Sequence, residues 1–144
     1  MEETLTVVQP VLLDVAKHNR AEFTCGVSGL DVFIKEKARK EAEQNLNRTF
    51  VLTAKDRPAQ IIGYYTLSPK HIKTADLPAE LTRKLPWYSN IGVTLLGRFA
   101  VAEKYQSNKR KDLKLGQLLL NDAKLRAWKA SKEIGSFQIS SIYL

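Results

Sequence analysis

The nine residues from Val93 to Val101 (VTLLGRFAV) are almost continuously apolar. Such a run is long enough for a β-strand and far too short to cross a bilayer. An apolar strand without alternation is expected where both faces of a sheet are covered. The run therefore predicts a central strand in a sheet that helices cover.

A helix is predicted on each side of this strand in the chain. The first covers about residues 30–43, with Ser28 and Asp31 as its N-terminal capping pattern. The second begins near Leu115 and ends at Gly135, which suits the left-handed conformation of a C-terminal cap. The apolar residues that mark one face are Val32, Phe33, Ala38 and Ala42 in the first helix and Leu115, Leu118, Leu119, Ala123 and Ala127 in the second.

The remaining segments supply strands and one long loop. Residues 49–53 and 60–67 are rich in β-branched and aromatic residues, so they predict an antiparallel hairpin. Residues 5–13 are interrupted by a proline and predict an edge strand or a bulge. Residues 68–90 contain three prolines and predict a long surface excursion. Residues 136–143 alternate apolar with polar side chains and predict a last strand.

Length and composition limit the class of protein. A chain of 144 residues that is 44% apolar can bury one core, so residues 1–144 are expected to form a single domain. The single cysteine, Cys25, excludes an internal disulfide, and the separated histidines His18 and His71 predict no metal site. Because neither a signal peptide nor a membrane-length apolar run is present, we expect a cytoplasmic protein without a membrane partner.

The formal net charge of +8 favours phosphate-bearing partners, although a basic balance also serves solubility. Basic residues gather where the second helix begins, since Lys109, Arg110, Lys111 and Lys114 precede Gly116. The unpaired amides and positive dipole end of a helix bind anions, cationic side chains add charge, and glycine permits close approach to the backbone. The segment is therefore either a pyrophosphate site or a solvated basic loop.

Six short motifs follow one another along the chain: His18–Arg20, Phe23–Gly26, Leu30–Ile34 with Ala38, Ile61–Ser68, Leu85–Tyr88 and Leu95–Val101. In this order and spacing they resemble the GNAT superfamily of acetyltransferases, in particular the toxins of type II toxin–antitoxin systems. The resemblance implies an α/β (α+β) fold with a mixed, largely antiparallel sheet flanked by helices. Compared with that family, the C-terminus is expected to be shortened, lacking the last helix and the strand or strands that follow it.

The resemblance implies acetyl-CoA as co-substrate. The pantetheine arm would pair with the backbone of Phe99, Ala100 and Val101 on the fourth strand, and Gln106 matches the glutamine or arginine that opens the pyrophosphate loop. The loop departs from the glycine-rich family pattern because it is longer and basic. The implied cofactor-binding residues are Phe99, Ala100, Val101, Gln106, Lys109, Arg110, Lys111, Lys114, Leu115 and Gly116.

No catalytic residue is assigned. Family members carry a tyrosine on a helix beyond the fifth strand, thought to protonate the thiolate of coenzyme A, and Tyr143 lies in the predicted last strand rather than in such a helix. Tyr64 and Arg98 are the substrate-binding candidates. Tyr64 and Tyr65 point to opposite faces of a strand, so at most one lines a groove and the other packs in the core. For Arg98 the alternative is a structural ion pair.

The resemblance implies acetylation of the amino group of aminoacyl-tRNA, which would block translation. It also implies a ribbon–helix–helix antitoxin as neutralising partner and a homodimer as assembly, and the short C-terminus adds an edge that a second copy could cover. Two alternatives remain open. One is a catalytically inactive remnant that binds antitoxin, RNA or cofactor, and the other is an acetyltransferase acting on a protein N-terminus or a small amine.

Overall fold

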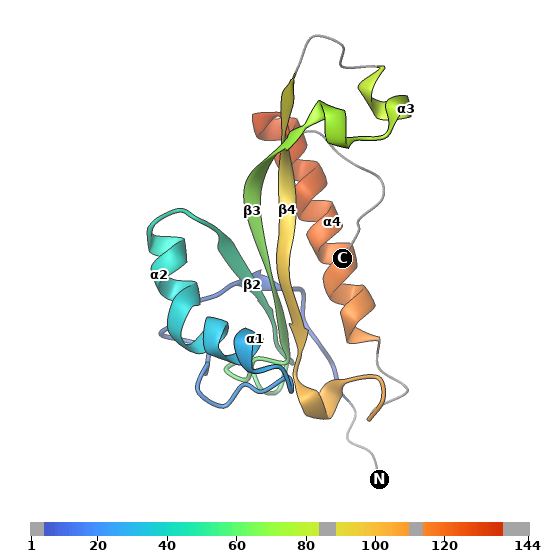
Figure 1. The fold of residues 1–144 in the computed structure, drawn as a ribbon. Coiled ribbons are helices and arrows are strands. Elements are labelled where there is room, and N and C mark those ends of the chain that lie inside the picture. Colours follow the sequence, from blue (N-terminus) through green and yellow to red (C-terminus); the bar gives the residue numbers. More distant parts are fainter. Residues whose placement is uncertain (1–4, 84–88, 110–113, 137–144) are drawn as a thin grey trace.

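A computed structural model describes residues 5–83, 89–109 and 114–136. Within these ranges the chain forms a four-stranded antiparallel sheet in the order β1-β2-β3-β4 (Figure 1). The strands are β1 (Val11–Leu12), β2 (Arg48–Leu52), β3 (Gly63–Lys73) and β4 (Asn90–Val101). Strands β2 and β3 form the hairpin that the sequence predicts, so each strand from β1 to β4 pairs with its neighbours in chain order.

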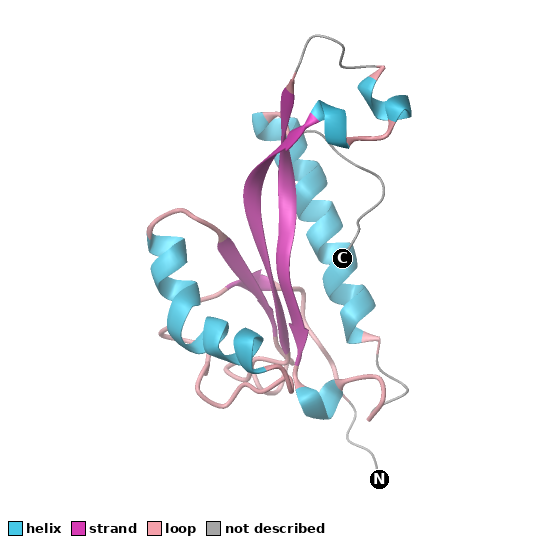
Figure 2. Ribbon diagram, viewed as in Figure 1, coloured by secondary structure: helices cyan, strands magenta, loops and turns pink. Residues whose placement is uncertain are grey.

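Helical segments connect and flank the strands, as Figure 2 shows in cyan. Between β1 and β2 the chain forms α1 (Ser28–Val32), the π-helix η1 (Phe33–Lys37) and α2 (Ala38–Glu43) without a break. Two short elements, the 3-10 helix η2 (Thr74–Asp76) and α3 (Ala79–Thr82), lie between β3 and β4. After β4 come the 3-10 helix η3 (Glu103–Tyr105) and the long helix α4 (Leu115–Ile134). Both predicted helices are thus confirmed.

Tyr64 and Tyr65 show which helix covers which face of the sheet. Both side chains are 0% exposed and, as neighbours on β3, point to opposite faces. The Tyr64 hydroxyl donates to the Leu30 carbonyl of α1 at 2.7 Å, whereas the Tyr65 hydroxyl donates to Asp122 of α4. The segment from α1 to α2 therefore lies on one face and α4 on the other.

A β-bulge interrupts β4 at its middle. Tyr65 pairs with Phe99 and Leu67 pairs with Leu96, so one residue of β3 lies opposite the two residues Gly97 and Arg98. The N–H of Arg98 donates to the Thr66 hydroxyl at 2.8 Å, which satisfies the backbone group that the bulge removes from the ladder. The alternation of side chains changes phase at this point.

Within the described part of the chain β3 lies between two strands and β4 is the last strand, so the predicted central position of β4 stays a prediction. Buried positions change from Ile91 and Val93 to Ala100 across the bulge, so two alternating patterns add up to one continuous apolar run. Of the predicted last strand, residues 137–143 lie outside the described residues.

Two element predictions need correction. The predicted excursion over residues 68–90 is shorter, because β3 continues to Lys73 and pairs with β4 from Asn90 onward. Pro69 is compatible with this pairing because the β2–β3 ladder does not extend past the pair of Arg48 and Leu67, which leaves the other edge of β3 without a described partner for the missing N–H. Of the edge strand predicted over residues 5–13, only β1 and an isolated bridge between Val7 and Ala54 form.

The predicted cap of the first helix is also wrong. Val27 occupies the N-cap position and no side chain caps the helix. Asp31 is used differently, because its carboxylate accepts hydrogen bonds from the Cys25 N–H at 2.9 Å and from the Thr24 hydroxyl at 3.2 Å. The acid thus fixes the loop before the helix instead of closing a capping box.

Candidate functional site

The outer edge of β4 presents backbone groups that β3 does not use. The N–H of Ala102 donates to the Ile62 carbonyl at 2.7 Å, and the Ala100 carbonyl oxygen lies 2.9 Å from where a Cβ of Gly63 would be. Because backbone groups alternate along a strand, those of Phe99 and Val101 point away from β3. Among the described residues, no further strand pairs with them, although the Val101 carbonyl accepts from the Gln106 side chain at 3.0 Å.

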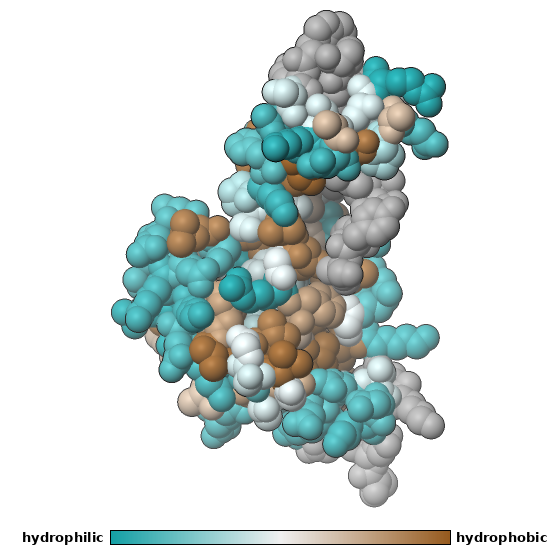
Figure 3. Space-filling model, in the orientation of Figure 1, coloured by the Kyte–Doolittle hydropathy of each residue, from teal (hydrophilic) through white to brown (hydrophobic). Residues whose placement is uncertain are grey.

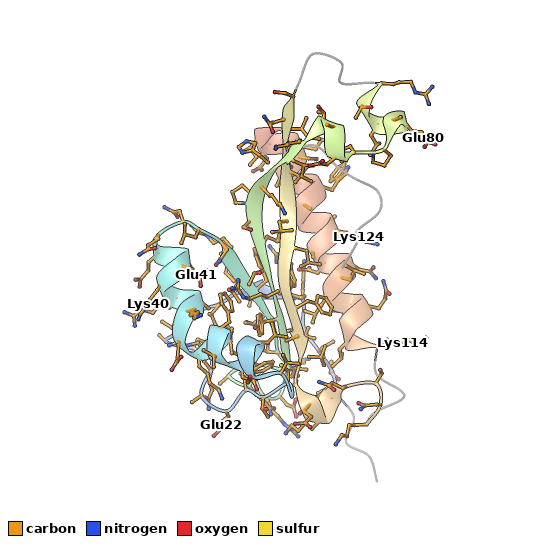
Figure 4. The ribbon with its side chains drawn as sticks, in the orientation of Figure 1. Glu22, Lys40, Glu41, Glu80, Lys114 and Lys124 are labelled. Atoms are coloured by element: carbon orange, nitrogen blue, oxygen red, sulfur yellow. The ribbon has the colours of Figure 1, made fainter. Side chains whose placement is uncertain are left out.

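The start of α4 lies next to this edge. A Cβ on Gly116 would be 3.7 Å from the Phe99 ring, so the first turn of the helix faces the end of β4. Lys114 occupies the N-cap position, no side chain caps the helix, and the first turn contains no acidic residue. Figure 4 shows Lys114 at this end of α4, with its side chain extending from the helix. The first-turn amides and the Lys114 ammonium together favour an anion.

Apolar surface surrounds the open edge. Figure 3 shows apolar residues gathered over the lower half of β4, between α1 and α4. Phe99 and Val101 are half-buried there, in contact with the core rather than part of it. An elongated ligand with an apolar arm and an anionic group would find a backbone edge, apolar contacts and an uncapped helix start next to one another.

Arg98 projects from the bulge of β4 toward the helix on the α1 side. Its guanidinium carbon lies 4.0 Å from the centroid of the Phe33 ring of η1, which is a cation–π contact. The side chain is half-buried, and no carboxylate of the described residues forms an ion pair with it. The structural ion pair considered from the sequence is therefore not found within the described part of the chain.

Tyr64 lies in the core. Its ring packs edge-on against Phe23, with centroids 5.5 Å apart, and stacks on Phe33 at 6.0 Å. Burial raises the pKa of its hydroxyl above the ordinary value, and the nearby charge of Arg98 opposes this rise. The expectation that Tyr64 lines a substrate groove is wrong for this structure, because the side chain is fully buried and its hydroxyl is bound to Leu30.

A separate cavity of about 860 Å³ opens beyond the end of β4. Three loops line it, over residues 19–24, 57–61 and 102–109. Its lining includes the apolar residues Phe23 and Ile61 and charged residues of both signs, among them Glu103 and Lys104. The mixed charge of the lining selects no ligand class.

Two curated relatives are similar to the chain over most of its length, whereas no protein-family model matches it. The probable toxin TacT of Sinorhizobium fredii is 30% identical over 100 residues, 69% of this chain and 54% of the relative. The tRNA-acetylating toxin of Mycobacterium tuberculosis is 33% identical over 113 residues, 78% of this chain and 62% of the relative. The chain thus spans less than two thirds of the length of either relative.

Solved structures agree. AtaT complexed with acetyl-methionyl-tRNAfMet matches with a TM-score of 0.76 and 26% identity, over 92% of this chain and 74% of the other. A mutant of KacT matches with a TM-score of 0.76 and 27% identity, over 94% and 75%. The chain belongs to the GNAT-fold toxin family. A further GNAT structure, AtaTR bound with acetyl-CoA, matches with a TM-score of 0.69 and 27% identity, over 92% and 73%.

Most GNAT positions predicted from the sequence come together at one place. Phe99, Ala100 and Val101 end β4, and Lys114, Leu115 and Gly116 begin α4 beside them. Of the three backbones on β4, that of Ala100 is turned toward β3 and only its neighbours face the open edge. Lys109 is at the cavity instead, and Arg110 and Lys111 lie outside the described residues.

Gln106 has a role that the sequence did not indicate. Its amide donates to the Cys25 carbonyl at 2.8 Å and to the Val101 carbonyl at 3.0 Å, so it ties the loop before α1 to the end of β4. Both amide hydrogens are engaged in these bonds, which leaves its oxygen available. The residue fixes the end of β4, and no local motif signals a bond to a residue 81 positions away.

The remaining reactive side chains serve the fold. Burial raises the pKa of the Cys25 thiol, which makes it a poor nucleophile. His18 is buried and its Nδ1 accepts from the Asp14 N–H at 3.0 Å; burial, with Lys17 adding to it, lowers its pKa. Among the residues that the structure describes, no group of His, Cys, Asp and Glu could hold a metal ion, and no helix is long and apolar enough to cross a membrane.

Proposed function

We propose that this protein is an acetyl-CoA-dependent N-acetyltransferase toxin that acetylates the amino group of aminoacyl-tRNA and thereby blocks translation. The observation that carries the proposal is the open backbone edge at Phe99 and Val101 beside the uncapped start of α4. The similarity to a tRNA-acetylating toxin and to AtaT in complex with acetyl-methionyl-tRNAfMet supports the choice of reaction and acceptor.

The residues fit acetyl-CoA by the chemistry of their donors. Acetyl-CoA, when bound, supplies an acetyl group activated as a thioester. The N–H groups of Phe99 and Val101 can donate to the carbonyl oxygens of the pantetheine arm, as they would to the carbonyl oxygens of a neighbouring strand. The amides of Leu115 and Gly116 with the Lys114 ammonium can hold the pyrophosphate. Lys109, Arg110 and Lys111 precede this helix start in the chain and contribute to the net positive charge, which attracts anionic ligands.

The open-edge N–H groups have a second possible task. Charge develops on the carbonyl oxygen when an amine attacks a thioester, and backbone donors fixed in place stabilise that charge without rearranging. The N–H groups of Phe99 and Val101 can act as these donors, because the bulge and the pairing with β3 fix the direction of their amides. The net charge of +8 suits a polyanionic acceptor.

The partners follow from the same proposal. A ribbon–helix–helix antitoxin would neutralise the protein, two copies would form a homodimer, and both would act in the cytoplasm. Similarity to a tRNA-acetylating toxin and to AtaT in complex with acetyl-methionyl-tRNAfMet favours aminoacyl-tRNA over a protein N-terminus or a polyamine. Acceptor discrimination tests this choice directly. Radiolabelled acetyl-CoA incubated with charged tRNA, uncharged tRNA, a peptide and spermidine should label the charged tRNA alone.

The variant Val101→Pro tests whether the open edge of β4 binds acetyl-CoA. It removes the N–H of Val101 that points away from β3 and leaves the hydrogen bonds to β3 intact. The affinity for acetyl-CoA should fall by about tenfold at most, the effect of one hydrogen bond worth about 1 kcal/mol. Val101→Ala is the matched control, because it shortens the side chain and retains the N–H. Equal affinities of the two variants, with both folded by circular dichroism, would remove the open edge from the proposal.

A further inference from the structure

The Arg98 guanidinium is positioned by the bulge and left without an acidic partner. Because Gly97 and Arg98 both lie opposite Thr66, the backbone turns and directs Arg98 onto the Phe33 ring. The contact with the ring leaves the five N–H donors of the guanidinium without a hydrogen-bond partner among the described residues. The residue is half-buried, not fully buried, so these donors can reach a ligand.

Asp31, an acid of α1, is already engaged in hydrogen bonds. Asp31 and Arg98 both act electrostatically on the Tyr64 hydroxyl, which places the two charges in the same neighbourhood. The two oxygens of Asp31 accept from the Cys25 N–H and from the Thr24 hydroxyl, and both bonds belong to the loop before α1. Arg98 therefore has a positive charge beside the open edge and forms no ion pair with a described carboxylate.

Arg98 is adjacent in the chain to Phe99, whose backbone faces the proposed acetyl-CoA site. A group bound by Arg98 would thus lie beside the point of transfer, on the α1 side of the sheet rather than on the α4 side. The planar fork of a guanidinium matches the oxygens of a phosphate in a bidentate manner. Of the three acceptor classes considered, only tRNA brings a phosphate next to its reactive amine.

We propose that Arg98 is an acceptor-binding residue that holds a phosphodiester near the aminoacylated end of tRNA and so selects tRNA over acceptors without phosphate. This inference rests on the proposed function. It predicts that Arg98 contributes to the KM for charged tRNA, and that it contributes neither to the affinity for acetyl-CoA nor to the KM for an acceptor without phosphate.

The test compares Arg98→Met, which retains the apolar stem over Phe33, with Arg98→Lys, which retains the charge and loses the fork. Arg98→Met should raise the KM for aminoacyl-tRNA by about tenfold, with kcat within about twofold of the wild-type value. It should also reduce the slope of log KM against log salt concentration by about one, the value for one lost phosphate contact. Arg98→Lys should raise KM by about threefold and keep the salt dependence. With aminoacyl-adenosine, an acceptor without phosphate, neither variant should change KM.

Arg39→Met is the matched control, because Arg39 is an exposed residue of α2 and its loss changes the net charge equally. Its KM should stay within about twofold of the wild-type value. A wild-type KM and salt dependence for Arg98→Met would overturn the inference, and so would an equal rise of KM for aminoacyl-adenosine or a loss of thermal stability without a change in KM. A wild-type protein that labels no charged tRNA would instead overturn the proposed function.

Discussion

The hydroxyl of Tyr65 should be worth more to stability than that of Tyr64, its neighbour on β3. Both rings are 0% exposed, so the two substitutions by phenylalanine remove the same atom from equally buried positions. The Tyr65 hydroxyl donates to the Asp122 carboxylate, whereas that of Tyr64 donates to a neutral carbonyl. The comparison isolates the charge of the acceptor.

The size of each stability loss depends on the charge of the acceptor and on the hydrogen bonds that the acceptor keeps after the hydroxyl is removed. Hydrogen bonds to charged groups contribute about 1.5–3 kcal/mol and those between neutral groups about 1 kcal/mol. After Tyr65→Phe, Asp122 still accepts from Arg126 Nε at 3.0 Å, so the carboxylate is not left alone and the cost should be about 2 kcal/mol. Tyr64→Phe should cost about 1 kcal/mol. For a domain of this size the two values correspond to falls in Tm of about 6 °C and about 3 °C.

The assay is urea unfolding of both variants at pH 7, followed by circular dichroism, with Tm as a second measure. A double-mutant cycle of Tyr65→Phe with Asp122→Asn should give a coupling of about 1 kcal/mol, because the two residues are in contact. Arg126 also donates to the Pro10 carbonyl at 2.6 Å and stacks on Phe50, so its own contacts persist in both variants. An equal or smaller loss for Tyr65→Phe than for Tyr64→Phe would refute the reasoning.

Three further outcomes are expected. The pKa of His18 is lowered from 6.5, so its neutral form stabilises the fold fully above that pH, and this stabilisation should decrease as the pH falls below 6.5. Urea titrations should show that the unfolding free energy of the His18→Gln variant decreases less than that of the wild type between pH 7 and 5. Gly63→Ala should cost about 1–3 kcal/mol because its Cβ would lie 2.9 Å from a backbone oxygen and a leucine methyl, whereas Gly29→Ala, which meets open space in α1, should be neutral or stabilise by up to about 1 kcal/mol. Gln106→Ala should lower the unfolding free energy by about 1–2 kcal/mol because it loses two hydrogen bonds, and it should also weaken acetyl-CoA binding. An unchanged affinity for acetyl-CoA in calorimetry would show that Gln106 does not contribute to the cofactor site.

The sequence predicts those parts of the fold that depend on local periodicity. The helix over residues 30–43, the β2–β3 hairpin and the end of α4 at Gly135 all follow from patterns within one segment, and Gly135 indeed has a φ of 71°. Propensity and capping chemistry act over a few residues, so a single segment contains the information needed.

The features that the sequence did not reveal depend on contacts between distant segments. The bulge at Gly97 and Arg98 is set by pairing with β3, and the resulting phase change made an alternating strand look uniformly apolar. The side chain of Gln106 acts on Cys25, and the placement of Tyr64 depends on the packing of α1. For the proposed site, the sequence indicates the positions at the end of β4 and the start of α4, and the structure adds the direction of each backbone group, which depends on pairing with β3.

The π-helix η1 has a consequence for how the chain folds. The Tyr64 hydroxyl binds the Leu30 carbonyl, and Arg20 donates to the carbonyls of Ile34 and Lys35 at 3.5 and 3.3 Å. These partners come from β3 and from the loop before α1, so the wider turn is stabilised only once those segments have packed. An isolated peptide over residues 28–43 should populate an ordinary α-helix instead. The placement of Phe33 beneath Arg98 would then be acquired late in folding, together with the sheet.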